Sequence, residues 1–479
     1  MRAHTQAKAI FLAILMVMMV QTAYVLGTPS AESTINSESA NAYSGNSTAP
    51  LHVLVNNTEM DPISFTSPWP PNNNSNSNNS GSGGGSGMTS GVPVAVGQGP
   101  GFYYMSHEMD SNDKHHIIHY GGSFGHTYGL RRKLLSSETI RVGLIGAGRN
   151  TRDRHIPGFQ EIDGVELVAV ANRSRESGRR VADAFNIPKV YDSWRELLED
   201  PDIDAVCIGT WPYMHCTLAI AALDKGKHVL CEARMAANSQ EAHAMLEASL
   251  TRPHLIAQIV PSPSTFKVDA LLMKLVAEGF IGDFLAVEMQ VLGTNFMDTE
   301  SPMHWRQDRS LSGYNILNMG IWYEAMIRWV GPATKVMAMT KVNVPRRKGD
   351  DGNWNAVTVP DHADILCELA NGGQAHMRFS SVTGCSPGSE AWLYGSDGTL
   401  YIDQKLNVFG AKKGDTKLTE IANPSETQHY WRVEEEFISA IRGTEPVTRT
   451  PFSVGVHYME FTEAVTRSAQ TGQSIALPL

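Results

Sequence analysis

Short apolar runs alternate with amphipathic segments along the chain after residue 138. Runs rich in β-branched residues stand at Thr139–Ile145 (TIRVGLI) and Val165–Ala171 (VELVAVA), and such runs are typical of parallel strands buried on both faces. Strands alternating with helices imply right-handed crossovers, so residues 139–262 are expected to form a Rossmann-type, doubly wound parallel sheet. The other strands and helices of this sheet are expected at 204–209, 228–231, 175–185 and 216–225.

The pattern changes after about residue 263, where runs with a period of two residues become frequent. Residues 263–479 are therefore expected to form an α+β domain with a largely antiparallel, open sheet. An open sheet with an apolar outer face also favours a homo-oligomer. Strands are expected at 284–293, 333–344, 363–370, 373–382 and 389–401, and helices at 268–278, 316–330, 428–442 and 452–471.

The first 138 residues show no pattern of a folded domain. Residues 1–27 combine a basic start, an apolar core and small residues, which is typical of a cleaved signal peptide. Residues 28–138 are expected to be a disordered, low-complexity leader or a propeptide, because a tract of Asn, Ser and Gly cannot bury enough apolar surface. The basic segment Arg131–Leu135 is either a processing site or a solvated linker. These features predict the secretory pathway or the extracellular space, with no membrane attachment of the mature form.

Charge and cysteine content exclude some classes of protein. The net charge of −10 argues against a nucleic-acid partner, which favours a basic surface. Five cysteines in 479 residues do not make a disulfide framework. No spacing of cysteine and histidine resembles a closed zinc site, so no metal site is predicted.

A glycine-containing turn follows the first predicted strand directly. Gly146 and Gly148 permit a tight turn and a close approach of the backbone to a pyrophosphate, and Arg149 follows them. The next helix would direct its N–H groups and positive dipole end at the same anion. Thr151 stands where the fingerprint needs a third small residue, and the loop is one residue longer than usual.

The residues after the second strand bear on the choice of cofactor. An acidic residue at this place binds the ribose 2′-hydroxyl of NAD and repels a 2′-phosphate. This chain has Asn172, Arg173 and Ser174 there, with a second arginine at Arg175. Guanidinium groups suit a phosphate, so NADP is favoured slightly over NAD; the alternative is that both arginines are solvated surface charges.

Further motifs resemble the Gfo/Idh/MocA family of NAD(P)-dependent sugar and cyclitol oxidoreductases, and the likeness covers residues 139–479. The third strand runs into Thr210, Pro212 and His215, and a Gly-Lys-His-Val strand leads to Glu232. The resemblance implies that these four residues contact the cofactor. It also implies a small, sugar-like substrate and a site next to the nicotinamide. Similar stretches lie at 305–306, 312–320, 393–400 and 472–478.

The chain departs from the family at its chemical positions. The family's dehydrogenases use the Lys of a Glu-Lys-Pro motif, with an Asp and a His four residues apart on a later helix. Here Ala233 stands at the Lys position, and Asn318 and Trp322 stand at the other two. None of these side chains can act as a general base. The leading candidates for proton transfer are Tyr323, Glu324 and His215, and Tyr213, Tyr314, His304 and Arg234 are further candidates. The candidates for substrate contact are Arg234, His304, Arg306, Asn318 and Trp322.

Three functions remain open at this stage. The first is an oxidoreductase that acts on a CH–OH or C=O group of a sugar, sugar acid or cyclitol. The second is a catalytically degenerate protein that binds a nucleotide or a sugar as a sensor or partner. The third is a redox-neutral, glycoside-modifying enzyme with retained NAD. An ionisable side chain near the nicotinamide C4 would favour an enzyme.

Overall fold

The computed structural model describes residues 139–479 and the backbone of three short strands, β1 (Val94–Ala95), β2 (Tyr104–Met109) and β3 (His115–His119). These strands form an antiparallel sheet in the order β1-β2-β3, within a leader that was expected to have no regular structure. The signal peptide and the basic segment 131–135 lie outside the described residues. Among the described residues, no helix has the length and apolar character to cross a membrane.

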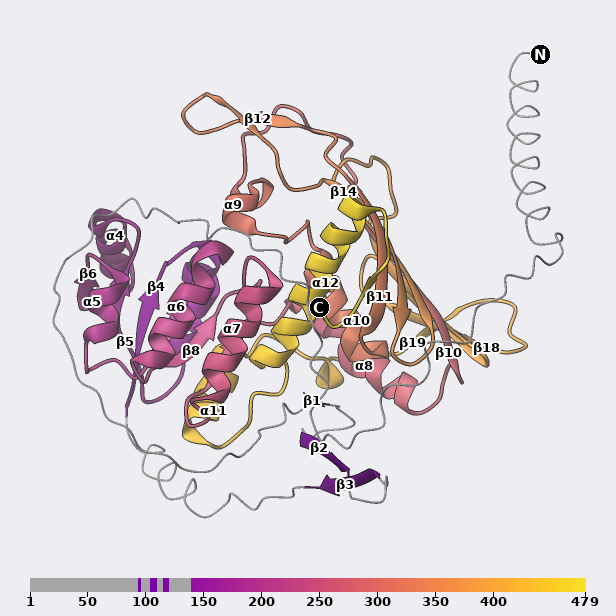
Figure 1. Ribbon diagram of the computed structural model, residues 1–479, viewed down its shortest axis with the longest axis horizontal. Helices are drawn as coiled ribbons and strands as arrows, with labels where there is room; N and C mark the ends of the chain where they lie inside the picture. The colour runs from indigo at the N-terminus through magenta and orange to yellow at the C-terminus, as the bar shows by residue number, and fades with distance from the viewer. Residues whose placement is uncertain (1–93, 96–103, 110–114, 120–138) are drawn as a thin grey trace, which may run out of the picture. The chain divides into compact units, whose positions relative to one another are not determined.

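The first large sheet has six parallel strands in the order β6-β5-β4-β7-β8-β9 (Figure 1). Numbered from its own first strand the order is 3-2-1-4-5-6, the dinucleotide-binding arrangement that reverses direction between β4 and β7. The predicted Rossmann sheet is therefore confirmed. Its strands are β4 (Ile140–Ile145), β5 (Val165–Ala171), β6 (Lys189–Tyr191), β7 (Ala205–Ile208), β8 (His228–Cys231) and β9 (Ala257–Ile259).

Helices cover both faces of this sheet. On one face, α3 (Ile156–Gln160), α4 (Arg175–Phe185) and α11 (Val433–Arg442) pack on strand residues. On the other face lie α5 (Trp194–Glu199), α6 (Pro212–Asp224) and α7 (Ser239–Leu250). The helix α11 belongs to the C-terminal part of the sequence, so the chain returns to complete the core of the first sheet.

The second large sheet has nine strands in the order β19-β18-β17-β16-β10-β15-β14-β11-β20. Only β10 and β15 pair in parallel; every other pair is antiparallel. This confirms the predicted α+β domain with a largely antiparallel sheet. Its strands are β10 (Phe284–Leu292), β11 (Ala333–Lys341), β14 (His362–Leu369), β15 (Gln374–Ser380), β16 (Ser389–Gly395), β17 (Gly398–Ile402), β18 (Val408–Lys412), β19 (Thr419–Ile421) and β20 (Ile475–Ala476).

Three helices accompany this sheet: α8 (Phe266–Ala277), α10 (Met319–Val330) and α12 (Phe452–Thr471). The long helix α12 contacts β11, α10 and α7, so it joins the two halves of the core (Figure 1). The segment predicted as one strand at 389–401 is in fact a hairpin, because Ser396 and Asp397 turn the chain between β16 and β17. A small hairpin, β12 (Arg346–Lys348) with β13 (Trp354–Ala356), was not predicted.

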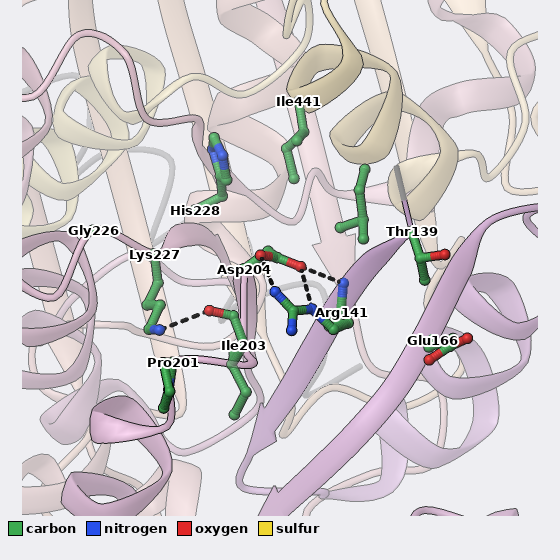
Figure 2. Close-up of a pocket in the computed structure, with 11 residues that line it drawn as sticks. Thr139, Arg141, Glu166, Pro201, Ile203, Asp204, Gly226, Lys227, His228 and Ile441 are labelled. Atoms are coloured by element: carbon green, nitrogen blue, oxygen red, sulfur yellow. Dashed lines mark hydrogen bonds and ion pairs between the residues drawn. The ribbon is translucent and has the colours of Figure 1, made fainter. Parts of the chain in front are cut away.

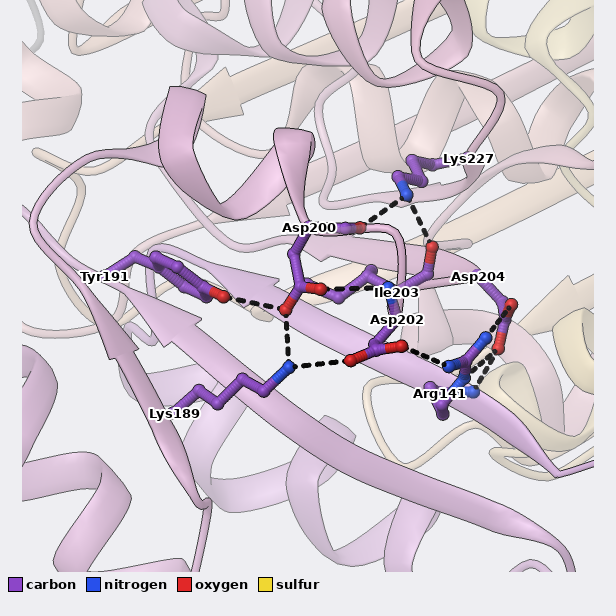
Figure 3. A network of polar contacts seen from close by, with 8 residues as sticks. All are labelled: Arg141, Lys189, Tyr191, Asp200, Asp202, Ile203, Asp204 and Lys227. Atoms are coloured by element: carbon purple, nitrogen blue, oxygen red, sulfur yellow. Dashed lines mark hydrogen bonds and ion pairs between the residues drawn. The ribbon is translucent and has the colours of Figure 1, made fainter.

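Charged side chains at the amino ends of the parallel strands are mutually paired (Figure 3). Arg141 forms an ion pair with Asp204 at 3.0 Å, and Lys189 forms one with Asp200 at 2.8 Å. The buried ammonium of Lys227 donates to the carbonyls of Asp200 at 2.8 Å and Ile203 at 2.7 Å. Every one of these cations has an oxygen partner within the protein.

A hollow of about 570 Å³ lies at the same edge (Figure 2). Its lining includes Thr139, Glu166 and His228, which stand at or next to the first residues of their strands. In an open α/β sheet ligands bind at the opposite edge, outside the carboxyl ends of the strands. We therefore locate the functional site at that opposite edge.

Candidate functional site

Two tight glycine turns meet where the strand order reverses. Gly146, after β4, has a φ of +83°, and a Cβ there would lie 2.6 Å from Thr210 Cγ2. A Cβ on Gly209, after β7, would lie 2.1 Å from Thr151 Oγ1 and 2.3 Å from Gly146 O. Side chains are thus excluded from both turns. Backbone lines the centre of the edge, as close approach to a pyrophosphate requires.

The extra residue of the glycine loop appears as a π-helical turn. Thr151–His155 forms this turn and α3 follows it without interruption. A π-turn accommodates one inserted residue within a helix and occurs often at functional sites. Thr151 itself is buried, so it fills the position of the third small residue. His155, at the end of the turn, points its ring into the protein and is fully buried.

His155 lies between two carboxylates. Its Nε2 is 3.1 Å from Glu232 Oε1, and its Nδ1 bonds Glu434 on α11. Burial by itself would lower the pKa of His155, but the hydrogen bonds to the two carboxylates outweigh burial and raise this pKa to about 9. His155 is therefore an imidazolium at neutral pH, and it ties the glycine loop to α11.

Glu232 is fixed as an anion at the end of β8. Burial would raise its pKa, but hydrogen bonding to His155 outweighs this effect and lowers it. Asn150 also donates to Glu232 Oε1, and the N–H of Ala233 donates to Oε2 at 3.1 Å. A carboxylate held in this way is suited to orienting a ligand and unsuited to accepting a proton.

The residues after β5 have distinct tasks. Asn172 Oδ1 accepts a hydrogen bond from the N–H of Ala147 at 2.7 Å and so steadies the glycine loop. Ser174 caps α4 by accepting from the N–H of Ser177. Arg175 pairs with Asp192 at 2.6 Å. Arg173 is exposed beside them.

Arg149 and Pro212 frame the glycine loop and the start of α6. The side chain of Arg149 is 90% exposed and lies 3.3 Å from Asp153. Pro212 occupies the first turn of α6, where its missing N–H costs nothing. Neither side chain provides acid–base chemistry, so their role here is to shape the edge.

His215 holds the backbone together and is not available for proton transfer. It is fully buried, with Nδ1 2.9 Å from Arg234 O and Nε2 3.0 Å from Thr210 O. Burial lowers its pKa despite these carbonyls. Both ring nitrogens face the protein, which argues against the catalytic role predicted for His215. The two contacts instead favour a positioning role, in which His215 holds the loops that contain Thr210 and Arg234.

Tyr323 and Glu324 also belong to the core, contrary to the predicted catalytic roles. The Tyr323 ring stacks on Phe461, and its hydroxyl accepts a hydrogen bond from Ala333 N–H at 3.0 Å. Burial raises its pKa well above the ordinary value. Glu324 bonds Arg328 at 2.6 Å and the N–H of Ser262 at 3.2 Å. Both side chains are less than 3% exposed, which leaves no room for a substrate.

Arg234 lies two residues after Glu232 and is 7% exposed. Its Nη2 donates to Leu317 O at 3.2 Å, just before α10. Gly320 makes room for its stem, because a Cβ there would lie 2.7 Å from Arg234 Cδ. Asn318 and Trp322 stand where the family has its Asp and His. Asn318 is exposed at the start of α10, and Trp322 is buried in the core.

An aromatic and basic rim borders this part of the edge. The rings of Trp211 and Trp305 stack with centroids 5.5 Å apart, and the Arg306 guanidinium lies 4.3 Å from the Trp305 ring centroid. His304 caps the short helix Trp305–Gln307, and its Nδ1 accepts from the N–H of Arg306 at 3.2 Å. Indole rings of this kind suit the apolar faces of a sugar or of a nicotinamide.

These residues fit a nicotinamide dinucleotide. The two glycine turns leave the backbone uncovered by side chains, Arg173 is exposed after β5, and Glu232 follows β8 at the same edge. Among the residues described, the Thr210 hydroxyl is one of eight buried side-chain atoms without a hydrogen-bond partner. Sequence analysis missed His155 and Glu434, because the pair is separated by 279 positions and no local pattern joins them.

Comparison with known proteins agrees with this fold. Residues 140–256 match a family model described as "Oxidoreductase family, NAD-binding Rossmann fold", and residues 270–401 match the "GFO/IDH/MocA C-terminal domain". Levoglucosan dehydrogenase of Pseudarthrobacter phenanthrenivorans is 28% identical over 278 residues, which cover 51% of this chain and 70% of that protein. Trans-1,2-dihydrobenzene-1,2-diol dehydrogenase of Bos taurus is 29% identical over 220 residues, 46% of this chain and 62% of that protein.

Solved structures share the fold. A levoglucosan dehydrogenase in complex with NADH and L-sorbose superposes with a TM-score of 0.63 at 22% identity, over 71% of this chain and 99% of that one. An oxidoreductase domain protein from Kribbella flavida gives a TM-score of 0.64 at 23% identity, over 71% of this chain and all of that one. With both halves of the fold matched, the chain belongs to the Gfo/Idh/MocA family of oxidoreductases.

Proposed function

We propose that this protein is an NAD(P)-dependent oxidoreductase that acts on a CH–OH or C=O group of a sugar, sugar acid or cyclitol. The observation that carries the proposal is the backbone cradle at Gly146 and Gly209, where a Cβ would collide with Thr210 and Thr151, so that only glycine can form it. The named relatives are dehydrogenases of small hydroxylated substrates.

In the oxidation direction, the substrate carbon would lose a hydride and its hydroxyl a proton. The nicotinamide accepts the hydride when the cofactor is bound. Glu232 would orient a ligand at this end of the edge, held by His155. The indoles of Trp211 and Trp305 would exclude water from one side. The proton would leave to solvent, because His215, Tyr323 and Glu324, the leading candidates to accept it, are engaged in the core.

NADP is the proposed cofactor, with NAD as the alternative. Asn172 cannot repel a phosphate, and its amide is committed to the loop. Arg175 is neutralised by Asp192, whereas Arg173 is exposed. A guanidinium at this position supplies a charge-assisted bond to a 2′-phosphate that NAD lacks.

The second candidate function is that of a protein that binds the cofactor at this edge but catalyses no reaction. It is favoured by one observation, namely that His215, Tyr323 and Glu324 are all buried and bonded to the protein. Such a protein would bind a dinucleotide or a sugar as a sensor or partner.

Turnover separates the two candidates. The full-length protein would be incubated with NADP⁺ or NAD⁺ and a panel of sugars, sugar acids and cyclitols, and reduced cofactor would be followed by its absorbance. Formation of NADPH that requires one substrate supports the oxidoreductase. Cofactor binding without turnover on any substrate, in either direction, supports the binding protein.

Location and assembly are proposed on separate grounds. The N-terminal sequence is the basis for proposing entry into the secretory pathway, which N-terminal sequencing of the protein from its host would test.

The exposed face of the second sheet carries Met337, Met339 and Leu366, each at least 51% exposed. We propose that this face pairs two copies of the chain. Sedimentation of wild type and a Met339→Glu variant would test this, with a monomeric wild type as the contrary result.

A further inference from the structure

Arg234 differs in its partners from two other arginines that have little exposure, Arg328 and Arg347. Arg328 bonds two carboxylates, Asp269 at 2.9 Å and Glu324 at 2.6 Å. Arg347 donates to two backbone carbonyls and lies 3.7 Å from Asp298. Among the described residues, by contrast, Arg234 has one hydrogen bond, to Leu317 O, and no carboxylate within 4 Å. A guanidinium offers five N–H donors, so most of its capacity is unused.

The charge of Arg234 is retained despite this isolation. Burial, followed by the charge of Arg306, lowers its pKa to about 10, which still leaves it protonated at neutral pH. The Arg306 guanidinium lies on the ring of Trp305, which stacks on Trp211 directly before α6 at the same edge of the sheet. A buried charge with few hydrogen-bond partners is costly unless an anion pairs with it.

The neighbouring carboxylates are already occupied. Glu232 accepts hydrogen bonds from Asn150, His155 and the N–H of Ala233. Glu324 is bonded to Arg328 and to the N–H of Ser262. Neither carboxylate forms an ion pair with Arg234, so an anionic ligand would find unused guanidinium donors there.

We propose that Arg234 and Arg306 bind a carboxylate of the substrate, so that the protein acts on a sugar acid or a related polyol carboxylate. This inference rests on the proposed function and names its substrate class. Arginine forks match a carboxylate with two parallel hydrogen bonds. A carboxylate fits better than a phosphate ester, because the nearby anion Glu232 disfavours a second negative charge.

The place of Arg234 explains how such a carboxylate would select the substrate. Arg234 follows Glu232 by two residues, so an acid group bound there lies next to the end of the edge assigned to the nicotinamide. The stem of Arg234 is fixed against Gly320. A bound acid would thus orient the sugar, and a neutral sugar would leave the buried charge uncompensated.

The test compares matched acids and neutral sugars. Binding of D-glucuronate and D-glucose, D-galacturonate and D-galactose, and D-gluconate and D-glucitol to the full-length protein would be measured by calorimetry, with and without NADPH. At least one acid is expected to bind about tenfold or more tightly than its neutral counterpart. Equal binding within every pair, or no binding of any acid, would overturn the proposal.

Variants connect the preference to the two arginines. Arg234→Met and Arg306→Met are each expected to bring the acid-to-neutral ratio to within about twofold of one, and Arg234→Lys to restore part of it. Arg195→Met is the matched control, because Arg195 also rests on an indole, 4.2 Å from the Trp194 ring centroid, but lies on α5. If Arg234→Met does not fold, Arg306→Met decides alone. An unchanged ratio in a folded variant contradicts the assignment.

Two further comparisons separate the carboxylate site from a phosphate site and from the proposed oxidoreductase activity. D-Glucose 6-phosphate is expected to bind less tightly than the preferred acid, and tighter binding of the phosphate would overturn the carboxylate assignment. The ratio is a binding measurement and needs no turnover. A preference for acids in a protein that never reduces NADP⁺ would therefore support the anion site while refuting the oxidoreductase.

Discussion

Charged side chains at the two edges of the parallel sheet differ in their bonding partners. At the amino-end edge, Arg141, Lys189 and Lys227 are all bonded to oxygens of the protein (Figure 3). At the carboxyl-end edge, Arg234 has a single carbonyl partner, and Arg173 is exposed. Internal pairing stabilises the fold, whereas unsatisfied donors at a backbone cradle are suited to a ligand. Substitutions at the first edge should change stability, and substitutions at the second edge should change binding.

The largest expected effect follows from filling the cradle. Gly146→Ala would place a Cβ 2.6 Å from Thr210 Cγ2 at a φ of +83°. Left-handed backbone costs about 1–2 kcal/mol and overpacking about 1–3 kcal/mol, so stability should fall by about 2–5 kcal/mol, and a glycine loop that moves to relieve the clash should no longer bind NADPH. Urea denaturation measures the stability, and fluorescence titration with NADPH measures the affinity.

Gly226→Ala is the matched control at the amino-end edge. Gly226 has a φ of +71°, but no atom lies within 4 Å of a Cβ there. Gly226→Ala should lose about 1–2 kcal/mol of stability, the cost of left-handed backbone, and keep the affinity for NADPH. Equal loss of affinity in both variants would show that the two edges are not distinct.

The buried imidazolium predicts a dependence of stability on alkaline pH. His155 has a pKa of about 9 in the folded protein against an ordinary 6.5. Its contribution is fully present below pH 6.5 and is lost as the pH rises through 9, because the unfolded chain loses the proton first. The free energy of unfolding in urea should fall by about 3 kcal/mol across this range.

The variant His155→Gln should remove most of that dependence, because no titrating ring remains between the two carboxylates. A wild-type protein whose stability is flat between pH 6.5 and 9 would contradict the assigned ion pairs. Urea titrations of both proteins at each pH provide the comparison.

A smaller effect is expected from the amino-end edge. Lys227→Met would leave the carbonyls of Asp200 and Ile203 without their donor. An unsatisfied buried group costs about 1–3 kcal/mol, so stability should fall by about 2 kcal/mol, while affinity for NADPH stays within twofold. A large loss of affinity for NADPH would indicate that the cofactor binds at the amino-end edge, contrary to the account.

The smallest effect concerns the choice of cofactor. Arg173→Ala should weaken NADPH binding by about tenfold, about 1.4 kcal/mol, and leave NADH binding unchanged. Arg179→Ala is the control, because Arg179 is an exposed arginine on α4, the helix that begins two residues after Arg173. Equal effects on both cofactors would remove the preference for NADP.

Much of the fold could be predicted from the sequence, because local pattern determines it. The predicted bounds of β5, α4, β8 and α12 coincide with those in the structure. The strand β6 was missed, since Lys189–Tyr191 is only three residues long. A periodicity of two cannot be recognised over so short a segment.

The site was less predictable, because its chemistry depends on distant partners. The glycine turn and Glu232 could be identified from motifs, but the ion pair of His155 with Glu434 spans most of the folded chain. Tyr323 and Glu324 were selected for their position on the helix beside Trp322. Their side chains point into the core, and sequence position alone does not give that direction.

Titration of the full-length protein with NADPH and with NADH tests the central claim most directly, namely that the carboxyl-end edge is a working dinucleotide site. The account predicts saturable binding of NADPH, about tenfold tighter than NADH, which Gly146→Ala abolishes and Gly226→Ala preserves. Absence of binding by either cofactor would contradict it.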